Sequence, residues 1–236
     1  SSLALLLQDL GRPHAALAEL NRAVQLQPRY YWGLYYRSEL LRYLKRYGPA
    51  LADADQVIAL FPNRGGGYLR RARVRQARGD LSGARADYDR MAASPAYYVL
   101  GRLARGVWLH LETGAFALAA KDLAAAVKRA GEKGSADETY FLTYQAAAEV
   151  RRGNLAEAKR LLARTDSRGS HRAKQVLSFL AGRIDADALS KALRPDGFRP
   201  HYVAFYQGLR AELRGDARAA LAHYWRVPGD WPGLYY

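Results

Sequence analysis

The chain has 236 residues, of which 50% are hydrophobic and 25% charged, a balance typical of a folded protein rather than a disordered one. It contains no cysteine, which excludes disulfides, thiolate catalysis and zinc sites with cysteine ligands. The 37 basic and 22 acidic residues give a formal net charge of +15, and most of the basic residues are arginine. Such a charge attracts anionic partners. No apolar stretch approaches the roughly 18 residues of a membrane-spanning helix, so we expect no membrane span.

A turn residue recurs along the chain about every 34 residues, and alanine follows it five positions later. The last interval is about twice as long and holds a degenerate unit near Gly182 and Ala188. A regular ladder of this kind indicates an internal repeat. Its members are Gly11 with Ala16, Lys45 with Ala50, Gly79 with Ala84, Gly114 with Ala119, Gly153 with Ala158, and Gly215 with Ala220.

Each turn residue separates two segments with helical patterning. Ala, Leu, Arg and Glu dominate both segments, and no β-branched alternation interrupts them. The pattern predicts a first helix before the turn, as over 65–78 or 201–214, and a second helix after it, as over 82–93 or 217–226. The small alanine lets the two helices approach closely. Proline ends the second helix at Pro28, Pro62 and Pro95.

With these features the sequence resembles the tetratricopeptide repeat family. Residues 208–224, GLRAELRGDARAALAHY, carry the family's small and aromatic positions in order, and residues 51–62, LADADQVIALFP, match a second helix and its exit. The resemblance implies an all-α fold, a right-handed superhelical solenoid of antiparallel two-helix repeats with a concave groove lined mostly by first helices. It also suggests a bacterial protein, or a fragment of one.

We expect a single repeat domain over residues 1–236. The first unit is truncated and keeps only residues 3–9 of its first helix, a linker over 131–136 lengthens one repeat, and residues 166–200 hold a compressed, degenerate pair of helices. The expected units are 1–28, 31–62, 65–95, 99–130, 138–166, 171–194 and 201–228.

The sequence lacks the patterns of an enzyme. Its five histidines show no metal-ligand spacing, and no phosphate-binding loop or nucleophile motif lies between a predicted strand and helix. We therefore expect no catalytic residues, no metal and no cofactor. The glycines at 65–67 stand at a predicted helix start, where backbone N–H groups could receive an anion. We favour the alternative, a turn between repeats.

Aromatic and basic residues concentrate on the predicted first helices. On one of them, Trp32, Tyr35, Tyr36, Glu39 and Tyr43 recur at the spacing of one helix face. Tyr, Trp and Arg are typical of recognition surfaces, because they combine contact area with hydrogen-bonding tips. Placed on the family's frame, the predicted groove residues are Trp32, Tyr35, Tyr36, Glu39, Tyr43, Arg70, Arg73, Arg105, Trp108, Tyr140 and Tyr144.

We therefore expect a non-enzymatic scaffold that binds a protein or peptide, preferably an acidic or aromatic-containing one, in a basic groove. An alternative is an anionic or glycan polymer, such as an exopolysaccharide or peptidoglycan, bound by a bacterial envelope protein. Nucleic acid is less favoured, because acidic residues interleave the predicted helices and no basic stripe is continuous. The sequence is compatible with both periplasm and cytoplasm.

Overall fold

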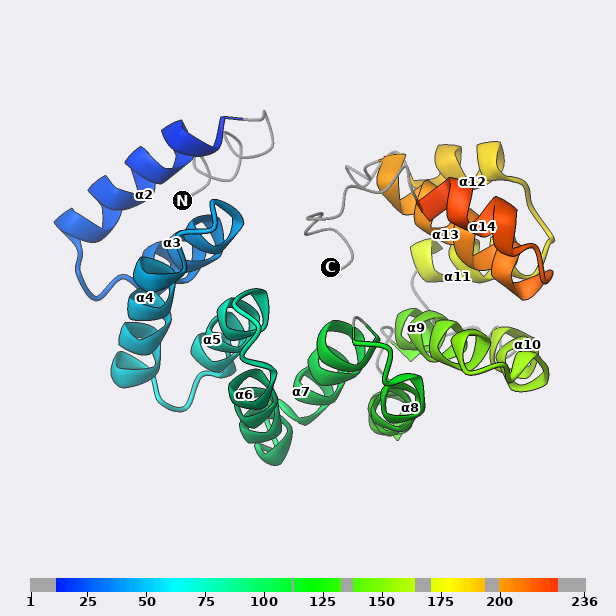
Figure 1. Cartoon of the computed structure of the whole chain (residues 1–236), viewed down its shortest axis with the longest axis horizontal. Coiled ribbons are helices and arrows are strands. Elements are labelled where there is room, and N and C mark those ends of the chain that lie inside the picture. Colours follow the sequence, from blue (N-terminus) through cyan, green and yellow to red (C-terminus); the bar gives the residue numbers. More distant parts are fainter. Residues whose placement is uncertain (1–11, 112, 133–137, 164–170, 194–199, 225–236) are drawn as a thin grey trace. The chain divides into compact units, whose positions relative to one another are not determined.

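The computed structural model of the chain describes residues 12–111, 113–132, 138–163, 171–193 and 200–224. All regular secondary structure in these ranges is helical, as predicted (Figure 1). No helix in the described ranges is both long and apolar enough to cross a membrane. The helices are α2 (Pro13–Leu26), α3 (Tyr31–Tyr43), α4 (Tyr47–Leu60), α5 (Gly65–Ala77), α6 (Leu81–Ala93), α7 (Tyr98–Ala104), η1 (Arg105–Leu111), α8 (Phe116–Glu132), α9 (Glu138–Arg151), α10 (Leu155–Ala163), α11 (His171–Leu180), α12 (Ala186–Leu193), α13 (Pro200–Leu213) and α14 (Ala217–Tyr224).

The chain divides into two compact units, unit 1 over residues 1–105 and unit 2 over residues 106–236. In unit 1 consecutive helices pack on one another from α2 to α7, and the first helices also contact each other, α3 with α5 and α5 with α7. Figure 1 shows these first helices on one side of unit 1, and α4 and α6 on the other. We call the former the first-helix side. The assignment of the whole chain to one repeat domain stays a prediction.

The predicted turn residues adopt the left-handed backbone conformation. Lys45, Gly79, Gly114, Gly153, Gly182 and Gly215 have φ between 58° and 85°, and Lys45 is the only non-glycine with a positive φ among the described residues. At Gly79 the turn is a Schellman motif: the N–H of Gly79 donates to the carbonyl of Gln76, and that of Asp80 donates to the carbonyl of Arg75. The ladder of turn residues therefore marks where first helices end, because glycine adopts this conformation without strain.

A carboxylate or amide directly after the turn glycine often begins the second helix. The Asp80 carboxylate accepts a hydrogen bond from the N–H of Gly83 at 2.8 Å, and Asp216 accepts one from Ala219 at 2.9 Å. The hydrogen bond from Gly83 is the main reason why the pKa of Asp80 is lowered. Two neighbouring residues thus end one helix and cap the next.

The ladder alanines lie where the paired helices cross. Ala16, Ala50, Ala84, Ala119, Ala158 and Ala220 are all buried. The ends of the second helices also agree with the prediction, since α2, α4 and α6 each end two residues before a proline. The degenerate region holds the expected short pair, α11 and α12. The predicted remnant helix over 3–9 and the first turn glycine, Gly11, lie outside the described residues.

Helix α9 is central to unit 2. It contacts α8, α10, α11 and α13, and every residue from 141 to 150 is buried. Its polar members need internal partners, and Glu149 accepts hydrogen bonds from Arg152 at 3.4 Å and Asn154 at 3.1 Å. Residues on this helix therefore form the core of unit 2 rather than its surface.

Candidate functional site

The predicted groove residues that the structure brings together lie on α3 and α5, on the first-helix side of unit 1. Helix α3 supplies the α3 aromatic cluster, which consists of Tyr31, Trp32, Tyr35 and Tyr36. The Trp32 ring stacks on Tyr36 with centroids 5.7 Å apart and meets Tyr31 edge-on at 4.9 Å. Tyr31 stacks on Tyr35 at 5.7 Å and meets Phe61 of the segment after α4 edge-on at 5.3 Å. Such ring contacts hold each aromatic side chain in one orientation.

Two predicted residues of α3 remain accessible despite this packing. Trp32 is 46% exposed and Tyr43, near the other end of the helix, is 37% exposed. Trp and Tyr side chains combine a large apolar contact area with a polar tip, and both residue types are enriched in protein interfaces. The three tyrosines of the α3 aromatic cluster are half-buried.

A network of guanidinium groups surrounds Glu39. Its carboxylate accepts two hydrogen bonds from Arg42, at 2.8 and 3.0 Å, and pairs with Arg70 of α5 at 3.0 Å. The Arg70 guanidinium also lies over the Tyr35 ring, 3.8 Å from its centroid. Burial raises the pKa of Glu39, but the charges of Arg70, Arg42 and Arg73 outweigh it and lower that pKa well below its usual range. Glu39 is therefore ionised.

Arg64 adds a further positive charge beside the aromatic cluster. Its guanidinium lies 4.8 Å from the Tyr31 ring centroid and 5.6 Å from that of Phe61. Burial raises the pKa of the Tyr31 hydroxyl, while Arg64 lowers it by a smaller amount. Tyr31 therefore stays neutral at physiological pH and keeps its hydroxyl as a hydrogen-bond donor.

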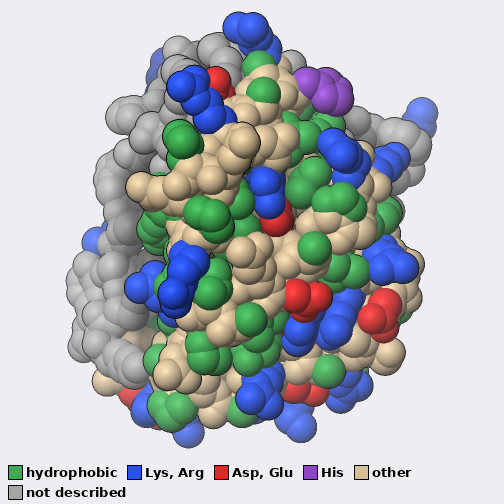
Figure 2. All heavy atoms as spheres, turned by 90° about the vertical axis from the view of Figure 1, so that its left-hand side faces the viewer, with side chains coloured by type: hydrophobic (Ala, Val, Ile, Leu, Met, Phe, Trp, Pro, Cys, Tyr) green, Lys and Arg blue, Asp and Glu red, His purple; other side chains and the backbone are tan. Residues whose placement is uncertain are grey.

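Basic side chains are also spread over the outside of unit 1. Figure 2 shows the side that lies on the left of Figure 1, where Lys and Arg alternate with hydrophobic side chains and Asp and Glu are sparser. The positive potential is thus not confined to the first-helix side, and charge alone does not locate a binding surface.

The other predicted groove residues are placed differently. Arg70 and Arg73 are buried, and Arg105 forms an ion pair with Asp89 of α6. Tyr144 lies in the buried helix α9. Trp108 and Tyr140 fall in η1 and α9, but their side chains lie outside the described residues. A continuous groove that includes all eleven residues stays a prediction.

The three glycines at 65–67 form the first turn of α5 and are close-packing positions. A side chain at Gly66 would collide with the Tyr31 hydroxyl, and one at Gly65 would lie 2.8 Å from the Tyr97 ring. At Gly67 an added Cβ would lie 2.7 Å from Ile58 of α4. Glycine is therefore needed here for the approach of α5 to its neighbours, which accounts for the cluster without an anion.

Sequence reasoning missed a repeating set of ion pairs in unit 1, in which partners are 16 residues apart. Arg71 of α5 donates to Asp87 of the following helix at 2.7 Å and to Asp55 of the preceding helix at 2.9 Å. One repeat earlier, Arg37 donates to Asp53 at 2.6 Å and to Asn21 at 3.2 Å. We call this set the Arg–Asp ladder; its later member is the pair of Arg105 with Asp89.

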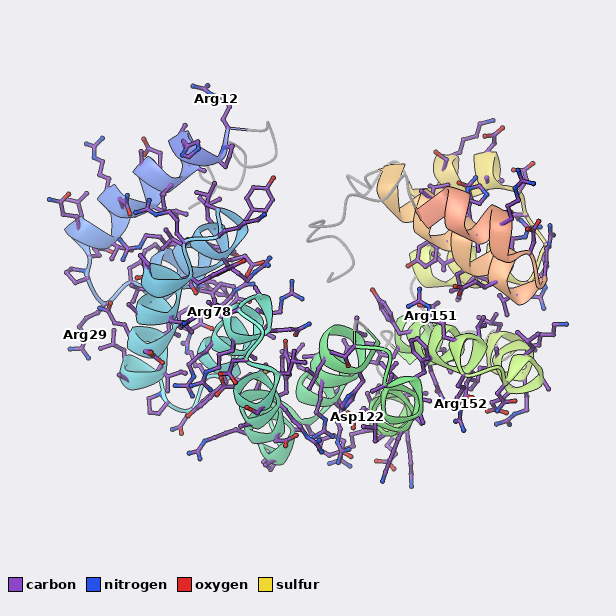
Figure 3. The ribbon with its side chains drawn as sticks, viewed as in Figure 1. Arg12, Arg29, Arg78, Asp122, Arg151 and Arg152 are labelled. Carbon is purple, nitrogen blue, oxygen red and sulfur yellow. The ribbon has the colours of Figure 1, made fainter. Side chains whose placement is uncertain are left out.

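The Arg–Asp ladder raises the pKa of Arg37 and of Arg71, chiefly through their hydrogen bonds to Asp53 and to Asp87. The signal was available in the sequence, because both the arginines and the aspartates recur every 34 residues. In unit 2, Nε2 of buried His110 lies 3.4 Å from the carboxylate of Asp122 in α8, which is labelled in Figure 3. These two residues are 12 positions apart, the separation of Arg75 from Asp87.

Among the described residues no group of three or more His, Asp or Glu side chains is arranged to hold a metal ion. The described part of the first-helix side instead carries the α3 aromatic cluster, with Arg64 and the ion pairs of Glu39 beside it.

The comparisons with known proteins agree with this architecture. No model of a known protein family and no curated protein matches the sequence. Among solved structures, the chain is similar to PilW, a widely conserved type IV pilus biogenesis factor, with a TM-score of 0.56 at 16% identity over 94% of this chain and 87% of that one. It is also similar to a thermophilic tetratricopeptide repeat protein of Thermus thermophilus, with a TM-score of 0.56 at 20% identity over 84% of this chain and 97% of that one.

Together, the helical hairpins with their repeated turns and these similarities establish the class of protein. The chain has the tetratricopeptide repeat fold.

Proposed function

We propose that this chain is a non-enzymatic scaffold that binds a peptide or protein partner on the first-helix side of unit 1. The observation that carries the proposal is Trp32, which is nearly half exposed yet held by ring contacts with its three tyrosine neighbours. An exposed aromatic side chain that is already ordered loses little conformational entropy when a partner covers it. Hot spots of protein interfaces are accordingly rich in Trp and Tyr.

The partner segment would contain acidic and aromatic residues. Arg64 lies beside the aromatic cluster and the chain carries a net charge of +15, so this side favours an incoming negative charge. Trp32 and Tyr43 lie at the two ends of the same helix and would contact apolar or aromatic side chains of the partner. Arg70 contributes through its charge, because its side chain is buried against Tyr35 and Glu39.

Selection of peptides from a random displayed library on the intact chain tests this proposal. Enriched peptides should carry acidic residues near an aromatic one, and the double variant Trp32→Ala with Tyr43→Ala should bind them at least about tenfold more weakly, as expected for a hot-spot pair. Leu118→Ala is the control, since Leu118 is 45% exposed on α8 and belongs to unit 2. It should change the affinity less than about twofold.

Two results would count against peptide binding. The first is enrichment of peptides whose affinity does not depend on Trp32 or Tyr43. The second is retention of the chain on peptidoglycan or an insoluble anionic polysaccharide that is lost in the same double variant, because stacked Trp and Tyr rings also suit a sugar face. That second result would favour the glycan alternative.

A further inference from the structure

A pocket in unit 2 has no role in the proposed partner surface. Its volume is about 560 Å³, within the range of small-molecule sites. It lies between α10, the turn that follows α11, and the last part of α13, which come together although α10 and α13 are about fifty residues apart in the chain. These helices contact one another, α10 with α11 and α13, and α11 with α13.

The charged side chains that line this pocket are all cationic. They are Lys159 of α10, Arg183 of the turn after α11, Arg210 of α13 and Arg214 directly after α13, and no Asp or Glu of the described ranges lines the pocket. The guanidinium groups of Arg210 and Arg214 both approach the turn residue Gly182. A Cβ placed on Gly182 would lie 3.5 Å from Nη2 of Arg210 and 4.0 Å from Nη2 of Arg214.

Arg210 is the innermost of these cations. It is half-buried, its guanidinium lies 4.6 Å from the Phe179 ring centroid, and one of its amino groups donates to the carbonyl of Ile184 at 3.2 Å. Its Nε is buried and meets no acceptor among the described residues. Burial lowers the pKa of Arg210, and the charge of Arg214 lowers it further, while Asp185 opposes both effects. An anion between the two guanidinium groups would relieve their repulsion.

The remaining walls of the pocket are apolar. Leu155 and Leu162 of α10 face Leu180 of α11 and Leu213 of α13 across it. A pocket with apolar walls and a few convergent charged groups is the usual design of a small-molecule site. Inorganic phosphate would satisfy the cations but would not cover Leu155, which is 36% exposed, so the fitting ligand also has an apolar part.

We propose that this pocket binds a small organic anion, a phosphate or carboxylate that carries an apolar group. The anionic group would lie between Arg210 and Arg214 above Gly182, with Arg183 and Lys159 close by, and the apolar group would contact the leucines. Guanidinium groups suit both anions, because they donate paired hydrogen bonds to two oxygens. The proposal is independent of partner binding on α3, which lies in unit 1.

Calorimetric titration of the intact chain with phenyl phosphate and with benzoate tests this proposal. Saturable binding of either probe supports it, and the one that binds more tightly identifies the anion. Arg183→Gln with Arg214→Gln should weaken binding at least about tenfold, because each removes a charged hydrogen-bond donor and neither holds the turn as Arg210 does. Lys128→Gln with Arg129→Gln removes the same charge from exposed positions on α8 and should change affinity less than about twofold.

A further variant tests the contact of the ligand's apolar group with the leucines. Leu155→Gln should weaken phenyl phosphate at least about threefold and leave inorganic phosphate unchanged, since a lost apolar contact is worth on the order of 1 kcal/mol. Circular dichroism should show the same helicity in every variant. Absence of saturable binding of both probes would overturn the proposal, as would equal losses in the pocket and α8 variants. Trp32→Ala should leave these titrations unchanged, which separates them from partner binding.

Discussion

Glu39 is a mostly buried carboxylate among three guanidinium groups. The free energy of unfolding therefore depends on whether its ion pairs outweigh the cost of burying its charge. Glu39→Gln removes the charge that compensates buried Arg70, so we expect a loss of about 3 kcal/mol of unfolding free energy at neutral pH. Urea denaturation followed by circular dichroism measures it. Glu132→Gln is the control: its ion pair with Arg129 has the same i, i+3 spacing but is exposed, and should be worth less than about 1 kcal/mol.

The same residue predicts a pH dependence. The folded-state pKa of Glu39 is lowered, so its contribution is fully present above the unfolded pKa of about 4.3 and is lost as the pH falls toward the folded value. The stability difference between the native chain and Glu39→Gln should therefore be constant above about pH 5 and shrink below it. A difference that grows on acidification would contradict the assignment.

Residue-level prediction from the sequence succeeded for side chains whose position follows from helix periodicity. Trp32, Tyr35, Tyr36, Glu39 and Tyr43 do share α3, and periodicity was sufficient to group them. It could not tell which first-helix residues are accessible. Arg70 is buried because its partners belong to the preceding helix pair, and such a partner is a tertiary contact that periodicity does not reveal.

At the level of the helical hairpin, Lys45 is the weak point among the turns. It adopts φ of 58°, which costs a residue with a Cβ roughly 1–2 kcal/mol relative to glycine. Lys45→Gly should therefore stabilise the chain by about 1 kcal/mol, partly offset by the added freedom of the unfolded chain. Gly79→Ala is the converse test, since a methyl group has open space there and would strain only the backbone. Thermal unfolding should move in opposite directions in the two variants.

The Arg–Asp ladder connects three helices through one guanidinium group, and its two carboxylates contribute unequally. Asp87 is buried and accepts from both Arg71 and Arg75, whereas the side chain of Asp55 is 56% exposed and pairs with Arg71. We expect Asp87→Asn to lower the free energy of unfolding by about 3 kcal/mol and Asp55→Asn to lower it by less than about 1 kcal/mol. Equal losses in chemical denaturation would mean that the exposed pair between repeats contributes as much as the buried pair within one repeat.

The turns were predictable and the ladder was detectable, because both follow from spacing along the sequence. A turn residue about every 34 positions is a local signal, and its left-handed conformation satisfies carbonyl groups of the same helix. The basic pocket of unit 2 was not predictable in this way. Its cations Lys159, Arg183 and Arg210 come from α10, the turn after α11, and α13, with no common period, and only the packing of α10 against α11 and α13 brings them together.

For the whole molecule, the net charge of +15 predicts weak, non-specific attraction to polyanions. Binding to a mixed-sequence DNA duplex should be measurable by fluorescence anisotropy near 50 mM salt and fall steeply by about 200 mM, because it depends on release of counterions. Trp32→Ala should not change it. DNA binding that resists salt and requires Trp32 would instead indicate nucleic-acid recognition on the first-helix side.

The 16-residue spacing of the Arg–Asp ladder, combined with the 34-residue period, preserves the separation between its ion-pair partners when one repeat is lost or gained. If residues 56–89 were excised, Arg105 would follow Asp55 by 16 positions, which is the separation of its present partner, Asp89. Each new junction would thus receive its ion pair without any further substitution. Such a chain can lengthen or shorten by gene duplication and deletion in whole repeats, whereas an insertion of any other length would put the charges out of register.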